Sequence, residues 1–236
     1  MMLNLTRFSN GEPEIFRSIQ GEGVNSGIVT VFLRLAFCNL KCSWCDTRYS
    51  WDWQHYYQNS EVVTMTLKEV AEHIRALGGK HILVTGGEPL IQQKMLSDLL
   101  APLKEEGYYI EVETNGTIPP NNDLLSLVDQ WNVSPKLENS GNTRSARELP
   151  EAYGVFSNLS SSYFKYVIQA ESDLNEVLSL IRRYQIAPSK VILMPEGTKR
   201  ETILTRGKWL ADLCKNQGYR FCTRLHILLW ESTRGM

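Results

Sequence analysis

The sequence lacks a long apolar run, an excess of basic residues and an even set of cysteines. Nowhere do about 18 consecutive apolar residues suggest a membrane-spanning helix, and residues 1–14 contain no apolar stretch typical of a secretory signal. The 25 Lys and Arg residues nearly balance the 26 Asp and Glu residues, so no basic surface for a phosphate backbone is expected. We therefore predict a cytoplasmic protein that binds neither membranes nor nucleic acids.

Internal repeats, low-complexity segments and a linker rich in proline, glycine and serine are also missing. With 236 residues, of which 42% are hydrophobic, the chain is long enough to bury one substantial core. The sequence predicts a single domain over residues 1–236, interrupted by a polar and aromatic insertion at about residues 49–64.

Apolar, β-branched runs recur along the chain and alternate with helical patterns. We expect buried strands at residues 29–35, 81–85, 108–113, 130–133, 163–168, 190–194 and 224–229. Helices are expected at residues 66–77, 95–106, 174–184 and 202–216. Thr66 and Glu69 predict a capping box at the start of the first helix. This alternation indicates an α/β fold with a mainly parallel sheet.

Polar motifs follow several of these strands. AFCNLKCSWCDT follows the first, TGGEP the second, ETNGT the third, SPK the fourth and MPEGT the sixth. In parallel α/β folds the loops at the carboxyl ends of the strands converge on one crevice. The sequence therefore predicts a ligand site at that edge of the sheet.

The first of these motifs contains three of the five cysteines, Cys38, Cys42 and Cys45. An odd number of cysteines with three in one short loop, residues 38–47, favours metal ligation in a reducing compartment over disulfides. Three thiolates on one iron–sulfur cluster leave one iron without a protein ligand, open to a small chelating molecule. A structural zinc site completed by His55 or a distant cysteine is the alternative.

The second motif, residues 85–89, contains two adjacent glycines after a strand. Glycine lets backbone approach a ligand closely, so Gly86 and Gly87 are expected to offer amide and carbonyl groups to its polar ends. The alternative is an ordinary turn.

The cysteine spacing, with Trp44 before the last cysteine, and the Gly-Gly-Glu-Pro element together resemble the radical S-adenosylmethionine (SAM) superfamily. The resemblance implies a partial, open (β/α) barrel and a 4Fe-4S cluster on the three cysteines. It also implies SAM on the open iron, cleaved to a 5'-deoxyadenosyl radical after reduction by a one-electron donor such as flavodoxin or ferredoxin. The cofactor-binding residues expected are Trp44, Asp46, Gly86, Gly87, Glu88, Glu113, Ser134, Pro135, Lys136, Lys165, Tyr166, Val167 and Ile168.

Residues 18–23 (SIQGEG), Arg34 and residues 45–47 (CDT) resemble the 7-carboxy-7-deazaguanine synthase family. The resemblance extends over nearly the whole chain, through residues 194–197 (MPEG) and 224–226 (RLH). This resemblance implies a radical carbon–nitrogen lyase of queuosine and deazapurine biosynthesis. The family converts 6-carboxy-5,6,7,8-tetrahydropterin to 7-carboxy-7-deazaguanine with loss of ammonia, requires Mg2+ and forms homodimers. Thr47 is the implied magnesium contact, and the implied substrate-binding residues are Ile19, Gln20, Gly21, Glu22, Arg34 and Thr85.

A pterin has hydrogen-bonding edges and a carboxylate, which need partners when they are buried. Gln20 can donate and accept along the amide edge, Glu22 can accept from N–H groups, and Arg34 can hold a carboxylate in a fork. No side chain is assigned to the radical chemistry itself. A glycyl-radical activating enzyme, which shares the cysteine and glycine motifs, is one alternative function, and a non-catalytic zinc or iron-sulfur binding module is another.

Overall fold

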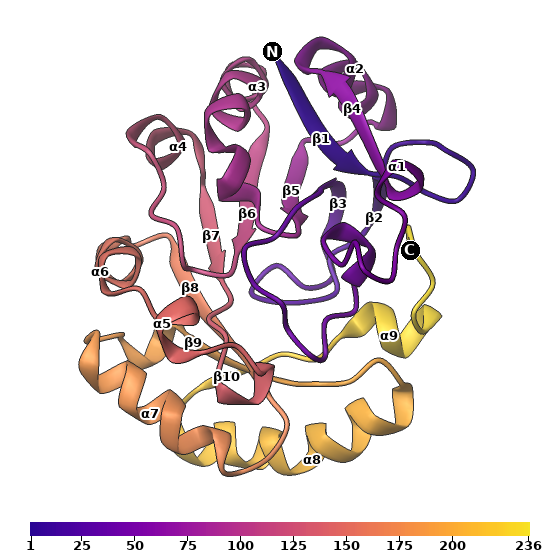
Figure 1. Cartoon of the computed structure of the whole chain (residues 1–236). Helices are drawn as coiled ribbons and strands as arrows, with labels where there is room; N and C mark the ends of the chain where they lie inside the picture. The colour runs from indigo at the N-terminus through magenta and orange to yellow at the C-terminus, as the bar shows by residue number, and fades with distance from the viewer.

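The computed structural model describes residues 1–236 and contains a ten-stranded sheet with helices on its outer side (Figure 1). The parallel strands follow one another in chain order, and the last does not pair with the first. This arrangement confirms the predicted open, partial (β/α) barrel. The strands are β3 (Val29–Leu35), β5 (His81–Gly86), β6 (Tyr109–Thr114), β7 (Gln130–Val133), β8 (Ser162–Ile168), β9 (Val191–Pro195) and β10 (Arg220–Phe221).

Antiparallel strands that are not among those expected from the sequence extend the sheet beyond β3. They are β1 (Met2–Thr6), β2 (Ile15–Ile19) and β4 (Val62–Thr66), with β2 paired to β3 and β1 paired to both β3 and β4. The predicted insertion at residues 49–64 is therefore not a free loop throughout. It contains a short helix, α1 (Gln58–Glu61), and then enters the sheet as the edge strand β4, whose sequence VVTMT is rich in β-branched residues.

The outer helices are α2 (Leu67–Leu77), α3 (Gln93–Glu105), α4 (Asn122–Leu127), α5 (Arg144–Arg147), α6 (Pro150–Asn158), α7 (Asp173–Arg183) and α8 (Arg200–Gln217). The predicted capping box of α2 is confirmed, because the Glu69 amide donates to the Thr66 hydroxyl at 3.3 Å and the Thr66 amide donates to the Glu69 carboxylate at 2.8 Å. None of the helices combines the length and the apolar character needed to cross a bilayer.

The strand predicted at residues 224–229 is wrong, because these residues form α9 (Leu225–Trp230) and the preceding strand is β10. Short apolar runs do not distinguish a strand from a helical turn. Here Ile227 is buried while Leu229 is half exposed, which suits a short helix packed on one side. The Arg224 guanidinium also donates to the Gly197 carbonyl oxygen at 2.7 Å, fixing the point at which the chain turns into α9.

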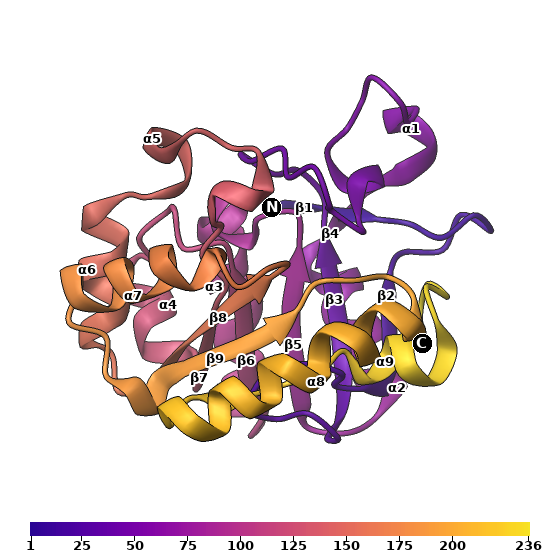
Figure 2. The same cartoon turned by 90° about the horizontal axis from the view of Figure 1, so that it is seen from below.

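Alternation along the strands separates an apolar outer face from a polar inner face. On β8, Tyr166 and Ile168 are fully buried in the core beneath the helices, whereas Lys165 and Val167 face the inside of the partial barrel. Figure 2 shows α8 along the outside and both α1 and α5 at one edge of the strands. That edge is where the sequence analysis predicted the site.

Candidate functional site

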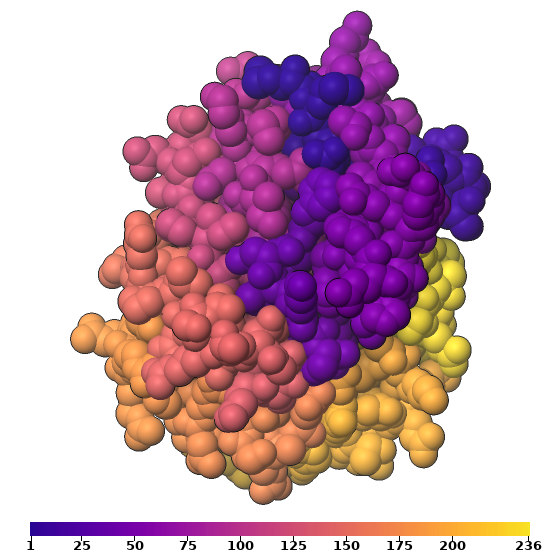
Figure 3. All heavy atoms as spheres, viewed as in Figure 1, coloured from indigo at the N-terminus to yellow at the C-terminus, as the bar shows by residue number.

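A pocket opens at the carboxyl ends of the parallel strands and is lined from β2, β3, β5, β6, β8, β9 and the loops that follow them. Together with the solvent at its mouth it contains about 1310 Å³ of empty space. In Figure 3 the purple segment that follows β3 crosses the centre of the viewed face and meets the salmon segment that follows β7.

Cys38, Cys42 and Cys45 all line this pocket as free thiols. Burial raises the pKa of Cys38 to about 12, and it also raises the pKa of Cys42. Metal ligation would therefore have to displace the thiol protons. Three such donors at the wall of a large pocket fit an iron-sulfur cubane with one open iron.

The structure does not support His55 as the ligand that would complete a zinc site with the three cysteines. His55, the suggested fourth ligand, lies outside the pocket with 64% of its side chain exposed, and its Nδ1 is 2.9 Å from the Asp52 carboxylate.

Gly86 and Gly87 hold the start of the cysteine loop against β5. The Gly87 amide donates to the Leu35 carbonyl oxygen at 3.0 Å, and the Glu88 amide donates to the Phe37 carbonyl oxygen at 2.8 Å. A Cβ atom at Gly87 would lie 2.0 Å from the Phe37 oxygen, which leaves no room for a side chain. These two amides are therefore bonded to protein, contrary to our expectation that the motif leaves its amides free for a ligand.

The Glu88 carboxylate does not face the pocket. It is fully buried and accepts from the Leu90 amide at 3.0 Å, the Thr114 hydroxyl at 2.8 Å and the Asn115 amide at 2.7 Å. Burial raises the pKa of Glu88 despite these hydrogen bonds. Glu88 therefore joins the loop after β5 to the end of β6, and its side chain is not a ligand contact.

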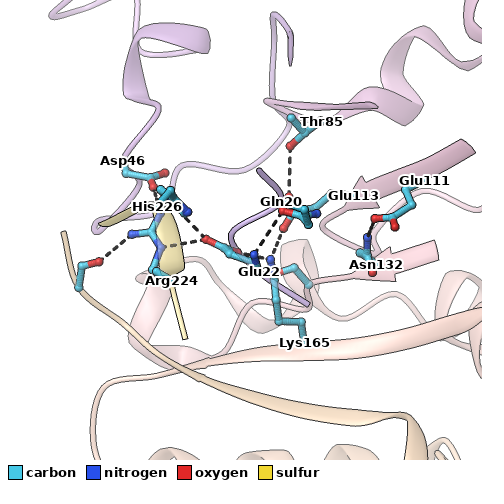
Figure 4. Close-up of polar contacts among 12 residues, drawn as sticks. Gln20, Glu22, Asp46, Thr85, Glu111, Glu113, Asn132, Lys165, Arg224 and His226 are labelled. Atoms are coloured by element: carbon cyan, nitrogen blue, oxygen red, sulfur yellow. Dashed lines mark hydrogen bonds and ion pairs between the residues drawn. The ribbon is translucent and has the colours of Figure 1, made fainter. Parts of the chain in front are cut away.

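A chain of alternating charges crosses the pocket (Figure 4). Lys165 is paired with both Glu22 and Glu113, and Arg224 is paired with Glu22 at 2.9 Å and with Asp46. Burial opposes charge on Glu22, yet Lys165 and Arg224 hold the pKa of this carboxyl well below its usual value. Burial likewise opposes charge on Lys165, but Glu113 and Glu22 raise its pKa. The site therefore presents fixed charges of both signs.

Arg34 reaches the pocket from β3 and is held from behind by Glu14. The Arg34 Nε atom donates to the Glu14 carboxylate at 3.1 Å, and neither Nη atom has a protein partner. Glu14 is buried and also accepts from Thr6 at 2.7 Å and from Tyr49 and Arg234 at 3.1 Å each. These contacts fix the Arg34 guanidinium and leave its two Nη atoms free for a ligand.

The predicted substrate residues Ile19, Gln20, Gly21, Glu22, Arg34 and Thr85 all line the same pocket. The Gln20 side-chain oxygen accepts from the Glu22 amide at 3.2 Å, and the Thr85 hydroxyl donates to Glu113 at 3.3 Å. Thr47, the predicted magnesium contact, also lines the pocket, with its hydroxyl 3.5 Å from the Cys45 sulfur.

The structure brings most of the predicted cofactor residues to the pocket but not Glu88, Pro135, Tyr166 or Ile168. Pro135 is buried away from the pocket, and Tyr166 and Ile168 face the helices because side chains alternate along β8. The residues that the structure places in the pocket are Trp44, Asp46, Gly86, Gly87, Glu113, Ser134, Lys136, Lys165 and Val167.

The site residues predicted from the sequence do not include Arg224, which pairs with two of them, Glu22 and Asp46. Arg224 begins an expected buried strand, although an arginine at the start of an apolar run is a signal for a charged contact. The prediction also lacks His226, Glu196, Asn115 and Trp51, all of which line the pocket. Burial lowers the pKa of His226, which favours its neutral form.

A polar layer beneath the pocket anchors the loop that carries Gln20 and Glu22. The fully buried Glu111 carboxylate accepts from the Asn132 side chain at 2.9 Å (Figure 4). It also lies 2.9 Å from the His81 Nε2 atom and contacts Asn25. Asn25 belongs to the turn between β2 and β3, so these contacts hold Glu22 in place relative to β6.

Comparison with known proteins agrees with this geometry. Residues 33–134 match the radical SAM superfamily. A protein of Pyrobaculum aerophilum named 7-carboxy-7-deazaguanine synthase is 37% identical to this chain, and the match covers 94% of this chain and 95% of that protein. A protein of Rhodopirellula baltica with the same name is 32% identical, and the match covers 94% of this chain and 87% of that protein.

Solved structures show the same fold. QueE from Escherichia coli superposes with a TM-score of 0.72 at 21% identity, covering 96% of this chain and 95% of that one. SuiB from Streptococcus suis bound to S-adenosylmethionine gives a TM-score of 0.56 at 12% identity, and the match covers 83% of this chain and 50% of that one. The identity and coverage of the named relatives show that this chain belongs to the 7-carboxy-7-deazaguanine synthase family.

Proposed function

We propose that this chain is a radical SAM enzyme that contracts the ring of 6-carboxy-5,6,7,8-tetrahydropterin to 7-carboxy-7-deazaguanine, releasing ammonia. The observation that carries the proposal is one pocket lined both by three free thiols and by Gln20, Glu22 and Arg34. The relatives with this name support the same reaction, and the product serves queuosine or deazapurine biosynthesis.

Cys38, Cys42 and Cys45 would hold the 4Fe-4S cluster, and Trp44, Ser134 and Lys136 would contact SAM. When bound, the cluster and SAM together supply a carbon-centred radical that abstracts a hydrogen atom from the substrate. The Lys136 ammonium is already oriented, because it donates to the Ser134 carbonyl oxygen at 2.8 Å and to the Ser134 hydroxyl at 2.9 Å. It also lies 5.7 Å from the centre of the Trp44 ring.

The chain's own residues orient the pterin. Arg34 offers both Nη atoms to the substrate carboxylate, with its Nε atom held by Glu14. Glu22 stays ionised between Lys165 and Arg224, so its remaining lone pairs accept from pterin N–H groups.

The proposal is tested by reconstituting the protein anaerobically with iron and sulfide, then adding SAM, Mg2+, a reductant and 6-carboxy-5,6,7,8-tetrahydropterin. We expect mass spectrometry to detect 7-carboxy-7-deazaguanine and 5'-deoxyadenosine. Cleavage of SAM with the pterin unchanged would overturn the substrate assignment, and failure to bind a cluster would overturn the radical SAM assignment.

Replacing Arg34 with lysine tests the carboxylate contact. Lysine keeps the positive charge but loses the planar fork, so we expect the KM for the pterin to rise about 10- to 100-fold, equivalent to about 1.4–2.7 kcal/mol. Steady-state kinetics measures this change, and Arg17→Lys, at an exposed position on the neighbouring strand, is the matched control. An unchanged KM for Arg34→Lys would contradict the assigned contact.

Magnesium is proposed to bind beside Thr47, where a hydroxyl can supply one oxygen ligand and the substrate and water the others. We expect EDTA treatment to lower turnover and added Mg2+ to restore it. In Thr47→Val the concentration of Mg2+ giving half-maximal turnover should rise several-fold, whereas Thr64→Val, on the edge strand β4, should leave it unchanged. An unchanged Mg2+ response in Thr47→Val would remove Thr47 from the metal site.

We also propose that the enzyme works as a cytoplasmic homodimer of single-domain subunits and takes its electron from a flavodoxin or ferredoxin. The family resemblance supports this proposal. Analytical ultracentrifugation of the cluster-loaded protein should give twice the mass of one chain, and a sedimenting monomer would contradict it.

A further inference from the structure

Two of the three cysteine sulfurs accept hydrogen bonds from residues outside the cysteine motif, and a side-chain nitrogen lies near the third. The Asn142 side-chain amide donates to the Cys42 sulfur at 3.3 Å, and the Trp51 indole N–H donates to the Cys45 sulfur at 3.4 Å. The Asn115 side-chain amide lies 4.0 Å from the Cys38 sulfur. These donors come from different parts of the chain, so the arrangement is not a by-product of one loop.

Several of these donors are held in place by contacts of their own. The Asn142 side-chain oxygen accepts from the Lys41 amide at 2.9 Å, which ties Asn142 to the loop that carries Cys42. The backbone amide of Asn115 donates to the buried Glu88 carboxylate at 2.7 Å. The Gly-Gly-Glu-Pro element therefore positions Asn115 beside Cys38. These contacts therefore fix Asn142 and Asn115 before any cluster binds.

Hydrogen bonds to cluster sulfurs raise the reduction potential, because they stabilise the more negative, reduced form more than the oxidised form. On the basis of the proposed function, we propose that Trp51 and Asn142, assisted by Asn115, set the reduction potential of the cluster through N–H donation to its cysteine ligands. They are positioning residues, since they act on the cluster through the thiolates and need not touch the pterin.

The proposal is tested by measuring the midpoint potential of the reconstituted cluster without pterin, using redox titration followed by electron paramagnetic resonance. Trp51→Phe keeps an aromatic ring but removes the N–H group. We expect its ratio of reduced to oxidised cluster at the wild-type midpoint to fall about tenfold, which corresponds to a shift of about 59 mV for one electron. The matched control is Trp53→Phe, since Trp53 contacts the Phe37 ring and no cysteine.

Asn142→Ala provides an independent measurement if Trp51→Phe binds the cluster poorly. Its potential should also be more negative than that of the wild type, and the rate of reductive SAM cleavage at a fixed donor potential should fall with it. Potentials within error of the wild type in both variants, at full iron content, would overturn the proposal. Failure of the wild-type protein itself to bind a cluster would instead overturn the proposed function, so the two failures are distinguishable.

Discussion

Gly87→Ala is expected to destabilise the protein by about 3 kcal/mol or more and to remove most of its cluster-binding capacity. The added Cβ would lie 2.0 Å from the Phe37 oxygen and 2.5 Å from the Phe37 carbonyl carbon. Both are backbone atoms next to Cys38, so no side chain can rotate away, and overpacking of this kind costs about 1–3 kcal/mol. Moving the backbone would also break the two hydrogen bonds from residues 87 and 88, at about 1 kcal/mol each.

The expected result is a melting temperature at least about 6 °C lower, together with little of the iron and sulfide that the wild type takes up. Gly154→Ala is the matched control, because a Cβ at this position in α6 meets nothing within 4 Å. We expect that variant to be unchanged or more stable by up to about 1 kcal/mol. Equal melting temperatures and iron contents for the two variants would show that the close approach of Gly87 to Phe37 does not matter.

Lys165→Met is expected to lower activity about 100-fold or more and to destabilise the protein by about 3 kcal/mol. Its ammonium pairs with Glu22 and Glu113 inside the pocket, where 4% of the lysine side chain is exposed. Removing one partner of a buried pair costs about 3–5 kcal/mol because the other charge is left uncompensated. Without the Lys165 ammonium, Glu22 also loses one of the two cations that position it, and a 100-fold loss of rate corresponds to about 2.7 kcal/mol.

Thermal melting and turnover of the cluster-loaded enzyme measure these effects. Lys215→Met is the control, since its ion pair with Asp212 is exposed by about 70% on both sides and should change stability by less than about 0.5 kcal/mol. Adding Glu113→Gln to Lys165→Met removes the orphaned charge and should restore part of the stability without restoring turnover. Similar melting temperatures for Lys165→Met and Lys215→Met would refute this account of the pocket.

The features that the sequence determined by itself are local ones. The parallel strands from β3 to β9 follow from apolar periodicity, and the capping box of α2 follows from Thr66 and Glu69 three residues apart. The clustered thiols follow from the spacing of Cys38, Cys42 and Cys45. These signals depend only on residues that are near one another in the sequence, so they can be recognised without knowing the fold. The placement of the polar motifs at one edge of the sheet can be recognised in the same way.

Only the tertiary structure decided which of those residues meet. Arg224 pairs with Glu22 across 202 positions and with Asp46 across 178, and no local pattern encodes such contacts. Glu88 was expected to contact the cofactor, but its carboxylate accepts hydrogen bonds from Thr114 and Asn115 at the end of β6. Burying a charge or a polar group requires a partner, and that partner comes from whichever strand or loop the packed barrel brings within about 3 Å.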